Sequence, residues 1–192
     1  DAIYEAIPPC MEPLSLTATN PTNTSVDLSW TGTNGDSGTY EIRYGAPGFV
    51  INDATSITVT GQSYQLNIPQ PGNYEYVVRQ VCTGENSEWS QRKAFRIFNT
   101  GEDCAAPIDI TSLPYTTTDN TSNYSDNPNI EGSPGSTGCG TTASYLNGND
   151  VVYKYVAAND GVIRVTMSNI LNTWSGIFAY NSCADIGVGC IG

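Results

Sequence analysis

The chain has 192 residues with a net charge of −12, from 19 acidic and 7 basic side chains and no histidine. An acidic surface repels phosphate groups, which argues against nucleic acids and anionic membranes as partners. Charged residues make up only 14% of the sequence, below the ~25% typical of soluble domains. No apolar run is long enough for insertion into a bilayer.

The first part of the chain has the pattern of an all-β domain. Residues 1–9 (DAIYEAIPP) have the composition of a linker, and short segments of alternating polarity follow it. Turn residues such as Pro71-Gly72 separate these segments. This density of strands is typical of a β-sandwich. The predicted strands are 14–19, 25–30, 40–44, 56–60, 63–68, 73–81 and 93–98.

The pattern breaks at 99–104, where a second domain is predicted to begin. Residues 108–149 are rich in Thr, Ser, Asn, Gly and Pro, with a faint strand signal at 108–113. Asp160-Gly161 predicts a hairpin turn between two later strands. Because the chain stops soon after its last cysteine, we expect this domain to be incomplete. The later predicted strands are 150–157, 161–168 and 175–180.

The six cysteines indicate disulfides rather than a metal site. Their number is even, no CxxC is present, and there is no histidine to complete a zinc site. Three disulfides imply an oxidising compartment. The polar N-terminus at Asp1 suggests a processed or internal piece of an exported protein. We therefore predict a secreted or cell-surface location.

Residues 10–98 combine Trp30 at the end of the second predicted strand, a YEIRY strand (40–44) and a PGNY corner (71–74). In these motifs they resemble a fibronectin type III domain, and we assign residues 10–100 to it. The alternation of Val26, Leu28 and Trp30 puts all three on one face, which predicts that Trp30 is buried. The resemblance implies that Tyr74 is the tyrosine-corner residue of this family, bonded back to the preceding loop. The motifs that carry the resemblance are Trp30, YEIRY (40–44), PGNY (71–74), SEWS (87–90) and KAFRIF (93–98).

Residues 101–192 begin with Asp103-Cys104 and contain two characteristic runs, at 146–169 and 174–190. In these motifs they are similar to a bacterial pre-peptidase C-terminal-type domain. This resemblance implies a second, jelly-roll-like β-sandwich, so that the chain holds two consecutive sandwiches. It also implies an appendage of exported proteases or surface proteins rather than a catalytic unit. The motifs are Asp103-Cys104, the run LNGNDVVYKYVAANDGVIRVTMSN (146–169) and the run WSGIFAYNSCADIGVGC (174–190).

The resemblances also suggest how the cysteines pair. Cys10 and Cys82 look like a variant common in secreted multidomain proteins of Bacteroidetes-type bacteria, and their positions can meet at one end of a sandwich. In the second domain we expect one disulfide between Cys104 and Cys139 and another between Cys183 and Cys190. The short ADIGVG segment between the last two suits a local loop.

No constellation for catalysis is evident. Gly35-Asp36-Ser37-Gly38 matches motifs of serine and aspartic proteases. Serine catalysis of that kind needs a histidine base, and aspartic catalysis needs a second carboxylate motif, which the sequence lacks. We interpret the segment as an ordinary turn between the second and third predicted strands. The other acids are spread over loops, which does not suit glycoside hydrolysis. We predict that the chain is not an enzyme.

Two kinds of binding site are compatible with the sequence. Asp119, Asp126 and Asp150 lie in loops that could supply oxygen ligands to calcium, although no calcium-loop motif is present and solvated acidic loops are the alternative. No other cofactor is expected. Aromatic residues could stack on a glycan, or could simply pack in the loops. The aromatic candidates are Trp89, Tyr115, Tyr124, Tyr145 and Trp174.

The leading hypothesis is a non-catalytic extracellular spacer and adhesion module of a larger secreted or surface bacterial protein. Its partners would be other domains of the same parent chain, and a glycan or a surface protein. One alternative is a carbohydrate- or protein-binding accessory region of an exported protease or glycoside hydrolase. Another is a subunit of a self-assembling surface filament, in which strand exchange completes the second domain.

Overall fold

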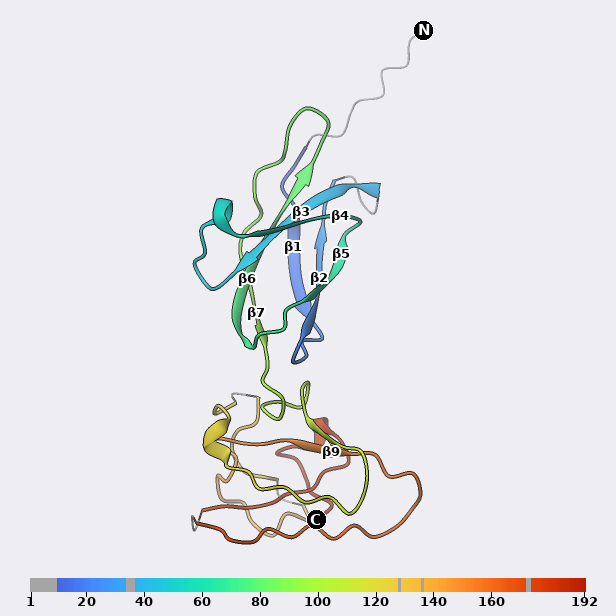
Figure 1. Cartoon of the computed structure of the whole chain (residues 1–192), viewed down its shortest axis with the longest axis vertical. Helices are drawn as coiled ribbons and strands as arrows, with labels where there is room; N and C mark the ends of the chain where they lie inside the picture. The colour runs from blue at the N-terminus through green and yellow to red at the C-terminus, as the bar shows by residue number, and fades with distance from the viewer. Residues whose placement is uncertain (1–9, 34–36, 128, 136, 172–173) are drawn as a thin grey trace. The chain divides into compact units, whose positions relative to one another are not determined.

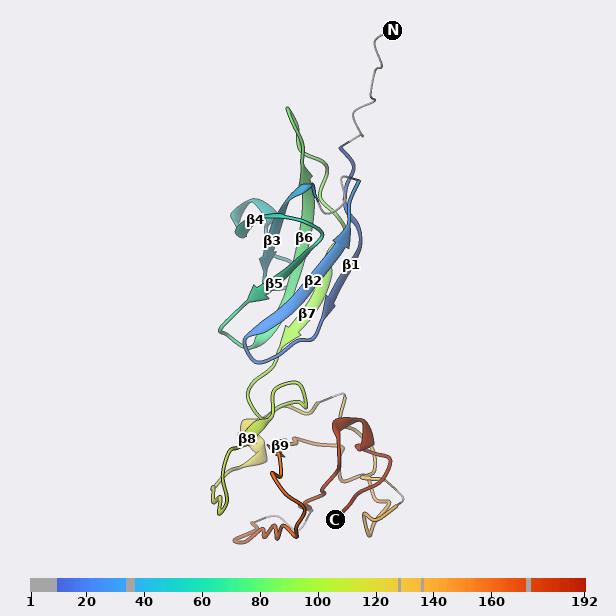
Figure 2. The ribbon, with the colours of Figure 1, turned by 90° about the vertical axis from the view of Figure 1, so that its right-hand side faces the viewer.

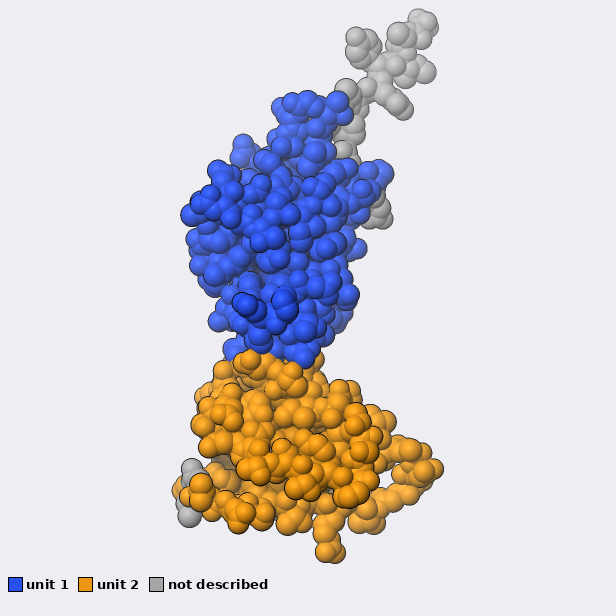
Figure 3. Space-filling view, viewed as in Figure 1, with its two compact units in different colours: residues 1–98 blue, residues 99–192 orange. Residues whose placement is uncertain are grey.

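The computed structural model describes residues 10–33, 37–127, 129–135, 137–171 and 174–192. The chain divides into two compact units, the first ending at Phe98 and the second beginning at Asn99 (Figure 3). Its regular structure consists of strands and single 3₁₀ turns, with no α-helix in the described ranges. The all-β prediction is confirmed. None of the described helical turns has the length and apolar character needed to cross a membrane.

The first unit is a sandwich of two antiparallel sheets (Figures 1 and 2). One sheet has the order β1-β2-β5 and the other the order β4-β3-β6-β7. All seven strands lie where the sequence predicted them. Their bounds are β1 Leu14–Thr19, β2 Ser25–Thr31, β3 Thr39–Gly45, β4 Thr55–Thr60, β5 Ser63–Asn67, β6 Gly72–Val81 and β7 Lys93–Ile97.

The core of this sandwich follows from the alternation of its strands. Val26, Leu28 and Trp30 of β2 are all buried, and Trp30 is only 4% exposed. The ring of Trp30 meets that of Tyr40 edge-on at 5.5 Å, a favoured geometry for aromatic pairs. Gly32 is needed beside this pair, since a Cβ there would overlap the Tyr40 ring. The predicted burial of Trp30 is confirmed.

Tyrosine hydroxyls tie the sandwich together. Tyr76 on β6 donates a hydrogen bond to the Thr17 carbonyl of β1 at 2.7 Å, which links the two sheets. Burial raises the pKa of the Tyr76 hydroxyl above its ordinary value. Tyr74 donates to the Gln70 carbonyl at 2.9 Å and its ring stacks on Phe95. This is the backward bond implied by the tyrosine-corner resemblance.

A disulfide joins Cys10, which precedes β1, to Cys82, which follows β6. This pairing agrees with the sequence-based expectation. The two cysteines are 72 positions apart in sequence, so the bond closes most of the unit into one covalent loop. In the chain-entropy account such a loop is worth about 4 kcal/mol of stability.

The second unit has far less regular structure than predicted. Strands β8 (Ile108–Ile110) and β9 (Tyr153–Tyr155) pair in parallel. Isolated bridges join Asp126 to Asn149 and Thr137 to Gly189. The predicted strands 161–168 and 175–180 are not formed, and neither is the hairpin. The jelly-roll expectation is thus not met within the described residues of this unit.

The physical reason is the lack of a layer against which these segments could pack. Strands become stable when one face is buried against another element. In the segment 161–168 the apolar side chains stay in solvent: Val162 is fully exposed and Val165 is 62% exposed. The sequence alternates as a strand does, but alternation alone does not supply a second element that would bury the apolar face.

The disulfides of the second unit also differ from the prediction. Cys104 pairs with Cys183, and Cys139 pairs with Cys190. The expected pairs Cys104–Cys139 and Cys183–Cys190 are therefore wrong. The cause lies in the backbone near the end of the chain: the Cys190 amide donates to the Thr137 carbonyl at 2.7 Å. This bond places Cys190 beside the segment that carries Cys139.

The core of the second unit is small and partly polar. Among its described residues few apolar side chains are buried, and polar ones such as Glu102 and Asn127 are buried as well. The Asn127 amide nitrogen donates to the Glu102 carbonyl at 2.9 Å and to Asp103 Oδ2 at 2.7 Å. Such satisfied polar groups avoid the cost of unpaired burial. The buried apolar residues are Ala106, Ile130, Leu146 and Cys190.

Candidate functional site

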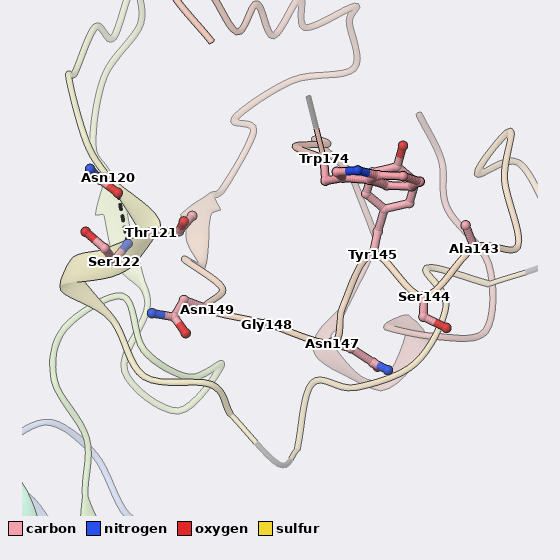
Figure 4. A pocket seen from close by; sticks show the side chains of 10 residues that line it. All are labelled: Asn120, Thr121, Ser122, Ala143, Ser144, Tyr145, Asn147, Gly148, Asn149 and Trp174. Carbon is pink, nitrogen blue, oxygen red and sulfur yellow. Dashed lines mark hydrogen bonds between the residues drawn. The ribbon is translucent and has the colours of Figure 1, made fainter. Parts of the chain in front are cut away.

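An open pocket of ≈ 620 Å³ lies in the second unit (Figure 4). Three parts of the chain that are far apart in sequence form it: the turn at Asn120–Ser122, the segment 143–149, and Trp174. Its lining residues are Asn120, Thr121, Ser122, Ala143, Ser144, Tyr145, Asn147, Gly148, Asn149 and Trp174.

One wall of the pocket is a capped turn. Residues Thr121–Asn123 form a 3₁₀ turn, η3, and the Asn120 side chain accepts a hydrogen bond from the Ser122 amide at 3.0 Å. Figure 4 shows this bond across from the aromatic rings. An asparagine that caps its own turn fixes the backbone locally. The hydroxyls of Thr121 and Ser122 are therefore presented from a defined loop.

Asp119 anchors this turn to β9. Its Oδ2 accepts hydrogen bonds from the hydroxyls of Tyr124 and Tyr153, each at 2.7 Å. The bond from Tyr124, and secondarily that from Tyr153, holds the pKa of Asp119 below its ordinary value despite some desolvation. Burial and the bond to Asp119 raise the pKa of Tyr124 to about 12. Asp119 thus acts as a structural acceptor in this arrangement.

The opposite wall is aromatic. The ring centroid of Tyr145 lies 6.1 Å from that of Trp174 and 5.7 Å from that of Phe178. Trp174 is 77% exposed, which is unusual for so large an apolar side chain. Gly176 makes room for this cluster, because a Cβ there would come within 2.8 Å of the Phe178 ring. Figure 4 shows the rings of Tyr145 and Trp174 side by side at one end of the pocket.

A half-buried carboxyl group lies in the segment after the pocket. Asp150 has one oxygen, Oδ2, that is out of contact with solvent and has no hydrogen-bond partner among the described residues. Burial, and then the negative charge of Asp126, raise the pKa of Asp150 to about 7. A carboxyl group in this state is protonated in mildly acidic solution.

The three predicted calcium candidates do not form one site. Asp119 is engaged with two tyrosines, while the charge of Asp126, after burial, contributes to raising the pKa of Asp150. Within the described ranges, no three acidic, cysteine or histidine side chains gather as a metal site would require. Calcium binding stays a prediction that rests on the sequence alone.

The structure separates the other aromatic candidates from the pocket. Tyr115 packs edge-on against Tyr153 at 6.2 Å, and Tyr124 is bonded to Asp119. Of the five aromatic candidates, only Tyr145 and Trp174 are among the described residues that line the pocket. Half of the protease-like segment 35–38 lies outside the described residues, since Gly35 and Asp36 are not described. The sequence did not reveal the polar wall, because its residues are ordinary loop residues.

Trp89 belongs to a cluster on the first unit, here called the charged column, that it forms with Arg43, Arg79 and Glu41. The Arg79 guanidinium carbon lies 4.5 Å from the centre of the Trp89 ring, and that of Arg43 lies 5.9 Å away. Both arginines also donate to Glu41, with Nε–oxygen distances of 2.7 Å. Burial alone would raise the pKa of Glu41, but bonds from Ser56 and the two arginines lower it. This column accounts for Trp89 without a ligand.

Several solved structures are similar to part of this chain. The chicken CNTN1 FN1–FN3 domains share 19% identity, with 47% of this chain and 33% of that chain covered and a TM-score of 0.41. The FN5 domain of Drosophila Lar shares 19% identity, with 47% and 97% covered and a TM-score of 0.39. The FN3 domain of human collagen XX shares 24% identity, with 50% and 99% covered and a TM-score of 0.38.

The chain therefore spans about a third of the chicken structure and nearly all of the other two. No known family model matches it, and no curated protein does. The first unit has a fibronectin type III-like fold. Its own strand order and its tyrosine corner agree with that description.

Proposed function

We propose that this chain is a non-catalytic extracellular module of a larger secreted or cell-surface bacterial protein. In this role the first unit acts as a spacer, and the second unit contributes adhesion. The observation that carries the proposal is the covalent construction of the molecule: each unit is closed by its own disulfides, one in the first and two in the second. Disulfides persist outside the cell, where a spacer must resist unfolding and proteolysis.

The absence of catalysis is part of the same proposal. The best candidate for acid–base chemistry is Asp150, whose pKa is raised to about 7 by burial and by Asp126. A raised carboxyl pKa can mark an active site, but it also occurs at structural positions. Asp150 Oδ2 is enclosed by protein, whereas a general acid must reach the substrate. This favours a structural role for Asp150.

The test is an assay of the purified full chain against fluorogenic peptides, esters and neutral glycosides. We expect no turnover above that of the heat-denatured chain. Turnover that survives repurification, and that is lost in Asp150→Asn, would overturn the proposal. As a positive test, the chain inserted between two folded reporter domains should resist extracellular proteases at its first unit when oxidised. Rapid cleavage there would count against a spacer.

The second candidate function is that of a carbohydrate-binding accessory region. The observation that favours it is the pocket in the second unit, with its exposed Trp174 and its uncharged polar wall. A binding region and a spacer are compatible, since they use different units of the chain.

A further inference from the structure

We infer that the pocket between the Asn120–Ser122 turn and the Tyr145–Trp174 pair is a binding site for an uncharged oligosaccharide. The inference deepens the adhesive part of the proposed function by naming a site and a ligand class. It rests on the shape and the chemistry of the two walls.

The aromatic wall matches the apolar face of a sugar. A pyranose ring carries its C–H groups on its faces and its hydroxyls around its edge. Trp174 exposes 77% of its surface, and Tyr145 lies beside it with a centroid separation of 6.1 Å. Exposed aromatic surface of this kind gains free energy when it is covered by apolar groups. Sugar C–H faces can cover it while their hydroxyls stay hydrogen-bonded.

The polar wall matches the edge of a sugar. Asn120, Thr121, Ser122, Ser144, Asn147 and Asn149 place amide and hydroxyl groups around the pocket. Both groups donate and accept hydrogen bonds, as sugar hydroxyls do. Ligand sites typically combine aromatic surface with a few fixed polar groups in ~300–1,000 Å³, and this pocket has a volume of ≈ 620 Å³.

The charge pattern selects neutral sugars. None of the ten residues that line the pocket is charged. The chain as a whole carries a net charge of −12. Acidic polysaccharides would therefore be repelled by the surrounding field and would find no cation inside the pocket. A neutral hexose or pentose polymer meets no such penalty.

The site is also organised in advance. Phe178 supports the Tyr145 ring from the side at 5.7 Å, and Gly176 leaves room for that contact. Across the pocket, Asn120 caps its own turn and Asp119 binds the turn to β9 through Tyr153. Groups that are fixed before binding lose less entropy when the ligand arrives. A loop that merely carried polar residues would have no such supports.

The test is titration of the full oxidised chain with neutral tetrasaccharides, namely those of glucose, xylose, mannose and N-acetylglucosamine. Tryptophan fluorescence and isothermal calorimetry report binding. We expect at least one of these sugars to bind saturably, and polygalacturonate to bind less well than the neutral sugars. Trp174→Ala should weaken binding by about tenfold or more, which corresponds to ~1.4 kcal/mol.

The matched control is Leu171→Ala. Leu171 is fully exposed and apolar but does not line the pocket, so its removal should leave the affinity unchanged. A second variant, Gly176→Ala, displaces the support of Tyr145 without deleting a pocket side chain, and should also weaken binding. Circular dichroism and disulfide mapping establish that each variant is folded.

The inference is overturned if none of the four sugars binds, or if Trp174→Ala binds as tightly as the parent chain. It is also overturned if a proline-rich peptide, rather than a sugar, binds the pocket in a Trp174-dependent manner. None of these results would contradict the non-catalytic spacer, which is tested by the turnover and proteolysis assays. Conversely, turnover of a glycoside would contradict the spacer while leaving the sugar site in place.

Discussion

At the scale of single residues, the carboxyl groups of Glu41 and Asp150 both have shifted pKa values, and their environments differ. Glu41 is surrounded by donors, with Ser56 Oγ at 2.8 Å and two arginines at 2.7 Å. Asp150 has one buried oxygen with no such donor among the described residues. Burial by itself would raise the pKa of either carboxyl group. In Glu41 the hydrogen bonds outweigh burial, so that the pKa is lowered. In Asp150 burial is not opposed, and the charge of Asp126 adds to it, so that the pKa is raised.

Glu41→Gln should destabilise the first unit by about 1–3 kcal/mol. The substitution keeps the size of the side chain but removes the charge that Arg43 and Arg79 face, and charge-assisted hydrogen bonds are the stronger ones. Urea unfolding monitored by fluorescence measures the loss. Glu75→Gln is the matched control, because Glu75 meets a single, more exposed arginine, Arg92, at 3.2 Å. An equal loss in both variants would show that the column adds nothing.

Asp150 should make the second unit less stable as pH rises. Its folded pKa of about 7 exceeds the ordinary 3.8, so between about pH 4 and pH 7 the folded state holds a proton that the unfolded state has released. Linkage then requires the unfolding free energy to fall with rising pH across that window. Asp150→Asn should flatten the fall and raise stability at pH 8.

Thermal unfolding from pH 4 to pH 8 measures this slope. Asp126→Asn removes the second cause of the shift and should weaken the pH dependence without abolishing it. A parent chain whose second unit is equally stable at pH 5 and pH 8 would contradict the assignment.

At the scale of elements, the contrast between the two units shows what alternation can predict. In the first unit each run of alternating residues has a facing sheet, so that β2 and β3 bury Trp30 and Tyr40 against each other. All seven strands were therefore predictable. In the second unit the run 161–168 alternates equally well but has no facing layer, and its side chains stay exposed. Burial is a property of two elements, which a single run cannot reveal.

The same reasoning applies to the candidate site. Tyr145 and Trp174 could be selected from the sequence as aromatic residues in loops. That they line one pocket with the Asn120–Ser122 turn could not be predicted, because these segments lie more than twenty residues apart and are joined by irregular backbone. The cysteine pairs of the second unit were predicted wrongly for the same reason: they join cysteines 79 and 51 positions apart, which no local pattern brings together.

Trp30→Ala should cost the first unit roughly 3–5 kcal/mol, because it leaves a cavity between the sheets. Chemical unfolding of the oxidised chain measures this. Trp30→Phe is the control: it keeps most of the ring and removes an indole Nε1 that is buried without a hydrogen-bond partner in the described structure. It should therefore cost less than Trp30→Ala. Unchanged stability in Trp30→Ala would place Trp30 outside the core.

At the scale of the whole molecule, the two units depend on different sources of stability. The first has a continuous apolar core of strand residues between its sheets. Among its described residues, the second buries few apolar side chains and leaves many others in solvent. A core of that size supplies little hydrophobic free energy. Its two disulfides, which join cysteines 79 and 51 positions apart, must then carry a larger share.

Removing Cys139–Cys190 should therefore unfold the second unit and spare the first. In the double variant Cys139→Ser, Cys190→Ser, the loss of a loop this long costs about 4 kcal/mol in the chain-entropy account, which we expect to exceed what the small core can supply. NMR amide spectra of the full chain, assigned residue by residue, measure the outcome: dispersed signals persist for residues 10–98 and collapse for residues beyond 98.

The reciprocal variant Cys10→Ser, Cys82→Ser should lower the melting temperature of the first unit without unfolding it, because its sandwich core remains. Collapse of both units in the first variant would show that they fold as one, and retention of both would show that the core of the second unit is sufficient without this disulfide.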